Sequence, residues 1–98
     1  MAYYEVHVPM RSPAGNSGIH VFTGLATDPD TALRLAQQTY RAAHEAQQAG
    51  RTIPGKRPDG WGARGYRPGW QLDWRAATAM LWKDLHGWPR SDGALRIA

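Results

Sequence analysis

Two runs of alternating apolar and polar residues, 3–10 and 19–26, constrain the fold of this 98-residue chain more than any other feature. In the first run Tyr4, Val6 and Val8 point to one side, and the residues between them point to the other. A period of two residues is typical of a half-buried β-strand. The segment between the runs, RSPAGNSG, is rich in turn-forming residues. Together these features predict an antiparallel β-hairpin.

The register of this hairpin is open, because a connection of eight residues does not determine which residues of the two strands pair. One register pairs Met10 with Ile19 and places Val8 beside Val21 on a common apolar face. We take this register as the expectation, since it gathers branched aliphatic side chains on the face that must be buried.

The same register gathers four side chains on the outer face of the hairpin: Tyr3, His7, His20 and Phe22. A sheet face that carries aromatic rings can stack on nucleic-acid bases. Such a face can equally be covered by the protein's own loop or by a second subunit. These four residues form a secondary candidate surface, with both interpretations open.

The next segment, 28–49, predicts a long helix. Thr27 or Asp28 can cap it, a proline is tolerated in its first turn, and Gly50 suits the position after its end. A stripe at 3-4-3 spacing would face the core: Leu33, Ala36, Tyr40 and Ala43. Because a hairpin cannot bury its apolar face alone, we expect the helix to pack across it in a two-layer α+β fold.

A Gly/Pro-rich basic loop, 51–69, follows, and its three prolines and five glycines exclude a helix. Beyond it the pattern predicts a short strand at 70–73, a second helix over about 74–86 and a last short strand at 94–98. A chain of this length forms one small globular domain, residues 1–98.

Apolar residues on more than one side of the expected second helix indicate a further contact. Met80, Ala76 and Ala79 lie off its inner stripe. A second copy of the chain or the C-terminal strand could cover them, so a homodimer is one interpretation.

The basic loop and Trp70, which together form a basic aromatic stretch over 51–70, carry the clearest functional signal. Five cations lie in it: Arg51, Lys56, Arg57, Arg64 and Arg67. The same stretch contains one carboxylate, Asp59. Since the whole chain has 12 Lys and Arg against 8 Asp and Glu, the formal net charge of +4 resides in this stretch. Such a cluster suits an acidic partner.

Two aromatic residues of the loop, Trp61 and Tyr66, can be interpreted in two ways. They could stack on unpaired bases while the cations neutralise phosphates, which predicts a small nucleic-acid-binding module. They could instead fold back into the core, as we expect for Trp70 and Trp74. The alternative function is a protein-interaction module, such as an inhibitor, an antitoxin-like protein or an assembly factor, whose loop docks on an acidic protein surface.

Other function classes find little support in the sequence. The G-x-G-x-x-G match at 60–65 has no strand before it and no helix after it, as dinucleotide binding requires. No catalytic motif is readable, and the four histidines fall on separate segments without the ligand set of a metal site. We therefore expect a non-enzymatic protein with no catalytic residues, metal or cofactor.

The sequence also bears on where the protein is located in the cell. No apolar run approaches the roughly 20 residues that span a bilayer, and MAYYEVHVPM lacks the features of a signal peptide. We expect a cytoplasmic protein that does not bind membranes. The chain has no cysteine, and its bias toward Arg and Ala is typical of GC-rich bacterial genomes.

Overall fold

The computed structural model describes residues 1–82 of the chain. The strand expected at 94–98, and the part of the expected second helix beyond Trp82, lie outside the described residues.

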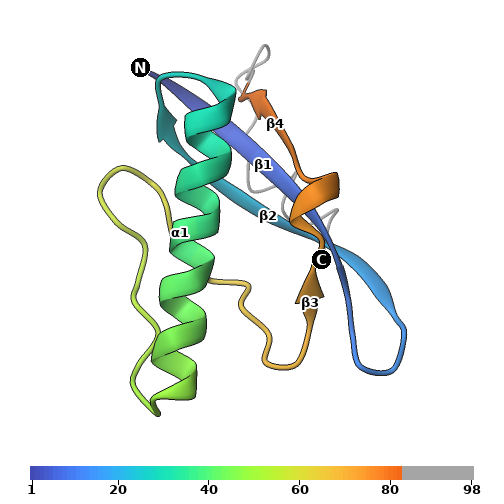
Figure 1. The fold of residues 1–98 in the computed structure, drawn as a ribbon. Helices are drawn as coiled ribbons and strands as arrows, with labels where there is room; N and C mark the ends of the chain where they lie inside the picture. The colour runs from blue at the N-terminus through green and yellow to red at the C-terminus, as the bar shows by residue number, and fades with distance from the viewer. Residues whose placement is uncertain (83–98) are drawn as a thin grey trace.

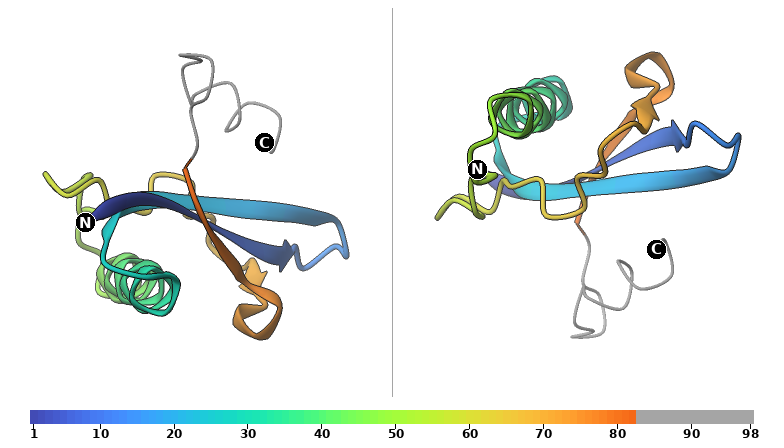
Figure 2. Two further views of the ribbon diagram at one scale, coloured as in Figure 1. Left: turned by 90° about the horizontal axis from the view of Figure 1, so that it is seen from above. Right: turned by 90° about the horizontal axis from the view of Figure 1, so that it is seen from below.

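The structure is a two-layer α+β fold, as the sequence predicts. Its elements are β1 (Ala2–Arg11), β2 (Ser17–Ala26), α1 (Pro29–Gln48), β3 (Gln71–Leu72), the 3-10 helix η1 (Trp74–Ala76) and β4 (Thr78–Leu81). All four strands form one antiparallel sheet, in which β1 pairs with β2 on one side and with both β3 and β4 on the other (Figure 1). Helix α1 and η1 lie on the same side of the hairpin (Figure 2).

The hairpin is confirmed, but the expected register is wrong by one residue. Val8 lies opposite His20 and Val6 opposite Phe22, so that Met10 faces Gly18. A slip of one residue moves every side chain of a strand to the other face. His20 and Phe22 therefore lie on the helix-covered face, where they are 6% and 1% exposed.

A tight hairpin turn sets this register. The amide of Ser12 donates to the carbonyl of Asn16 at 2.8 Å, and the amide of Gly15 donates back to the carbonyl of Ser12 at 2.9 Å. Gly15 has a φ of +88°, which favours glycine. The turn residues, rather than the pairing of branched side chains, decide which face each strand residue occupies.

Helix α1 agrees with its prediction at both ends. The carboxylate of Asp28 accepts a hydrogen bond from the amide of Thr31 at 2.8 Å, as an N-cap does. At the other end Gly50 has a φ of +71°, and the amides of Gly50 and Arg51 donate to the carbonyls of Gln47 and Ala46. This is the Schellman pattern, which satisfies the last carbonyls of a helix.

The buried face of α1 is formed by small side chains: Ala32, Ala36, Ala43 and Ala46. Of the expected stripe, Ala36 and Ala43 are buried, whereas Leu33 and Tyr40 are half-buried and pack against the core. Small residues let the helix lie close to the sheet, and Ala32, Ala36 and Ala43 share one core cluster with Val6. They also leave room in the core for a large side chain from elsewhere.

The second helix expected from about 74 is wrong for the described residues, which form an interrupted strand instead. Between the pairs Met10–Leu72 and His7–Thr78, β1 contributes two residues and its partner five. The three extra residues bulge out as η1, which places Trp74 against the core. The short strand expected at 70–73 is confirmed as β3.

Ala79 and Met80, which lie off the inner stripe of the expected second helix, belong to strand β4 instead. Ala79 and Met80 point to opposite faces of β4, as successive strand residues do. Met80 and Leu81 are 41% and 47% exposed.

Candidate nucleic-acid interface

The basic loop, 51–69, contains no helix or strand but is tied to the outer edge of β2. The amide of Leu25 donates to the carbonyl of Asp59 at 2.9 Å. The Asp59 carboxylate accepts a hydrogen bond from the amide of Trp61 at 3.2 Å, and the Trp61 carbonyl accepts one from the backbone amide of Arg57 at 2.9 Å. In Figure 1 this loop leaves the C-terminal end of α1 and turns back along the helix. These bonds give the loop a fixed path over the fold.

Trp61 is the anchor of the loop. Its side chain is fully buried, and its indole Nε1 donates to the carbonyl of Leu25 at 2.8 Å. The ring lies directly on Gly24 of β2, where a Cβ would come within 2.3 Å of it. At Gly60, which has a φ of +95°, an added Cβ would likewise lie 2.3 Å from the hydroxyl of Tyr3. The glycines thus serve close packing, and the structure assigns Trp61 to the core.

Tyr66 makes the second attachment of the loop, on the surface of α1. Its hydroxyl lies 2.9 Å from Nδ1 of His44, within hydrogen-bonding distance. Its ring centroid is 5.3 Å from that of Tyr40, and both rings pack against the buried residues of the core. Burial, with a smaller effect of Tyr66, raises the pKa of Tyr40. Tyr66 is half-buried in this position.

The cations of the loop face solvent while its rings face inward. Five exposed side chains carry them: Arg51, Lys56, Arg57, Arg64 and Arg67. Arg57 forms an ion pair with Asp59, with Nη2 and Oδ2 3.0 Å apart. The guanidinium of Arg67 lies 5.3 Å from the centroid of the Trp70 ring, which is half-buried and not part of the core cluster.

Four of these cations, all except Arg57, form no ion pair with the described carboxylates. An exposed ion pair such as that of Arg57 contributes only about 0–1 kcal/mol to stability. These four loop cations therefore carry positive charge that no carboxylate within residues 1–82 neutralises.

His20 lies beneath the loop. Its ring stacks on Phe22 with centroids 4.2 Å apart, and Nε2 points toward Gly65, at 3.3 Å from the position a Cβ would take. Burial, and to a lesser extent the charge of Arg67, lowers the pKa of His20 from 6.5 to about 4. The Tyr40 ring of α1 lies nearly perpendicular to the imidazole, with the two centroids 6.2 Å apart. His20 is therefore neutral at pH 7, and its uncharged ring packs beneath Gly65 of the loop.

We expect the stability of the protein to fall as the pH decreases from about 6.5 to about 4. Because the folded pKa of His20 is lowered to about 4, the unfolded state binds a proton first, and the stabilisation present above pH 6.5 is lost through this window. The linked loss is on the order of 3 kcal/mol. Urea titrations at several pH values measure it. His20→Leu, which cannot titrate, should show a smaller loss; an equal loss would contradict the assignment.

The secondary surface expected from the sequence, Tyr3, His7, His20 and Phe22, is not assembled. His20 and Phe22 lie under the helix, whereas Tyr3 and His7 lie on the opposite face of the sheet. The ring of Tyr3 is 4.7 Å from that of Trp82, and His7 Nε2 is 3.3 Å from the carboxylate of Glu5. The one-residue register difference accounts for this separation.

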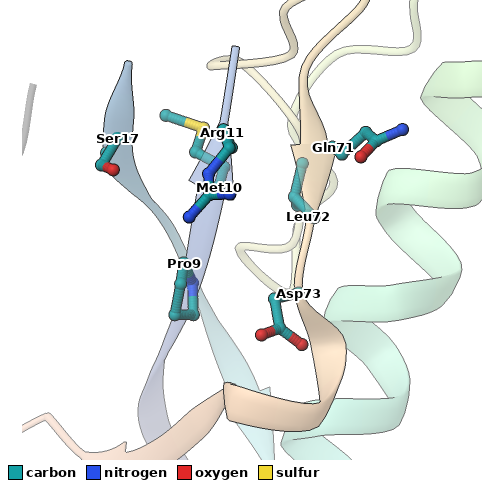
Figure 3. A pocket seen from close by; sticks show the side chains of 8 residues that line it. Pro9, Met10, Arg11, Ser17, Gln71, Leu72 and Asp73 are labelled. Atoms are coloured by element: carbon teal, nitrogen blue, oxygen red, sulfur yellow. The ribbon is translucent and has the colours of Figure 1, made fainter. Parts of the chain in front are cut away.

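A hollow of about 450 Å³ lies where β1, β2 and β3 run side by side (Figure 3). Its described lining includes Arg11, Ser17, Gln71 and Asp73. Asp73 is the one carboxylate among these lining residues, and it accepts a hydrogen bond from the amide of Arg75 at 3.2 Å. That described set offers no pair of groups for acid–base chemistry.

Two further findings concern residues 1–82. No three His, Asp or Glu side chains in this range are grouped closely enough to hold a metal ion. No helix in the described part of the chain is long and apolar enough to cross a membrane.

Comparison with known proteins adds no assignment, because no protein family, no curated protein and no solved structure matches the chain. The function must be inferred from the site itself.

Proposed function

We propose that the protein is a small non-enzymatic module that binds nucleic acid through the cations of the basic loop. The observation that carries this proposal is the separation of roles within one loop. Its tryptophan is buried at 0% exposure, while all five of its Lys and Arg side chains are exposed. A loop whose backbone is already fixed in this way does not have to be ordered when a ligand binds, which lowers the entropic cost of binding.

The alternative is a protein partner with an acidic surface. Interaction hot spots in protein–protein interfaces are usually aromatic or Arg side chains that enter a pocket of the partner. Trp61 is buried in the core, and Tyr66 packs against α1 with its hydroxyl beside His44, so neither ring is free to serve as such an anchor. Without an aromatic anchor the loop keeps only its exposed Arg and Lys side chains. Arg can itself be an anchor in a protein interface, but a set of cations with no neighbouring free ring suits a repeated array of phosphates better. A cytoplasmic location fits this proposal, and a homodimer remains compatible with it.

The salt dependence of binding tests the proposal. Four cations form no ion pair within residues 1–82: Arg51, Lys56, Arg64 and Arg67. They predict a slope of about −3.6 in a plot of log K against log salt for a duplex. Affinity should then fall on the order of 100-fold between about 50 and 200 mM salt. Fluorescence anisotropy with a labelled oligonucleotide measures the slope. An affinity that does not change with salt concentration, or no binding at micromolar protein in low salt, would contradict the proposal.

A pull-down separates the two candidates. If the partner is nucleic acid, nuclease treatment should abolish recovery. A co-purifying protein that survives the nuclease and is lost on Arg64→Glu would favour the alternative.

A further inference from the structure

The aromatic rings of the basic loop are all engaged within the protein. Trp61 is fully buried, and its one polar atom is bonded to Leu25. Tyr66 packs against Tyr40 and is held at its hydroxyl by His44. These two rings were the candidates for stacking on unpaired bases. Stacking by either would require it to leave its place in the fold.

The remaining ring of the stretch, Trp70, is also engaged. The guanidinium of Arg67 lies over the ring at 5.3 Å from its centroid. An edge carbon of the ring is 3.7 Å from the position that a Cβ of Gly18 would take. A base would have to displace Arg67 to stack there, at the expense of the cation–π contact.

We infer that the basic loop recognises the phosphate backbone of a duplex and does not read unpaired bases; this inference rests on the proposed function. Proteins that bind single strands gain roughly 1–3 kcal/mol from each base stacked on an aromatic side chain. This loop has no ring available for that gain and depends on charge alone. A duplex carries one phosphate charge per about 1.7 Å of its axis, so it offers these cations a denser array than a single strand.

The test compares four probes of equal length at one salt concentration: duplex DNA, duplex RNA, a single DNA strand and a single DNA strand that lacks its bases. We expect at least one duplex to bind about tenfold or more tighter than either single strand. The strand with bases and the abasic strand should bind within about twofold of each other. The two duplex arms decide whether B-form or A-form geometry fits the loop better.

The outcomes separate the inference from the proposal it rests on. A base-bearing single strand that binds tighter than both duplexes, or much tighter than the abasic strand, would overturn the inference and leave nucleic-acid binding intact. No binding to any probe would overturn both. Tyr66→Phe adds a control, because it removes the bond to His44 but keeps a ring: single-strand affinity should not change.

Discussion

Replacing Trp61 with alanine should destabilise the protein by about 3–5 kcal/mol, as expected for removal of a fully buried large aromatic side chain. The change leaves a cavity in the core beside Gly24 and removes the hydrogen bond from Nε1 to the Leu25 carbonyl. A loss of this size is a large part of the total stability of a small domain. Urea denaturation followed by circular dichroism measures it.

Trp70→Ala is the matched control for this experiment. It also removes a tryptophan from the basic aromatic stretch, but Trp70 is half-buried and lies outside the core cluster. We expect a cost of about 1–2 kcal/mol. If Trp61→Ala costs no more than Trp70→Ala, Trp61 is not the anchor of the loop.

Gly24→Ala should also destabilise the protein, although it adds only a methyl group. An ideal Cβ at Gly24 would lie 2.3–2.5 Å from atoms of the Trp61 ring, so the ring or the strand must move. Overpacking of this kind typically costs about 1–3 kcal/mol. Gly55→Ala is the matched control, because no atom lies within 4 Å of its ideal Cβ, and it should change stability by less than about 0.5 kcal/mol.

A double-mutant cycle makes this second prediction specific to one contact. In the Trp61→Ala background the clash at Gly24 no longer exists, so Gly24→Ala should be neutral or slightly stabilising, since alanine restricts the unfolded chain more than glycine does. Equal costs in both backgrounds would show that Gly24 is required for another reason.

The local signals of the sequence predicted the hairpin, the helix and its caps, because alternation and capping residues act over a few positions. The register was missed since both faces of β2 carry apolar side chains. Val21 and Phe22 are equally acceptable inner residues until the turn between Ser12 and Asn16 is known. The helix expected from about 74 was wrong because Ala and Leu favour a helix, and pairing of Thr78–Leu81 with β1 overrides that preference. The bulge at η1 also leaves no mark in the hydrophobic periodicity.

The burial of Trp61 could not be decided from the loop alone, because its partner Gly24 lies far away in the sequence. One signal was present: a glycine inside a strand often marks the close approach of another group. The contact between His44 and Tyr66 could not be predicted either, because it depends on the path of the loop over α1. The five cations were exposed as their residue type suggests, and their binding role stays a prediction.

The claim that loop cations, and not the overall charge, bind phosphate is tested most directly by comparing two double variants. Lys56→Gln with Arg64→Gln removes two exposed loop charges, and Arg34→Gln with Arg41→Gln removes two exposed charges from α1. Each variant lowers the net charge by the same amount, and salt slopes for duplex binding are measured by anisotropy. The loop variant should bind with a slope about 1.8 shallower than the unmodified protein, while the helix variant keeps the original slope. Equal slopes in the two variants would contradict the account.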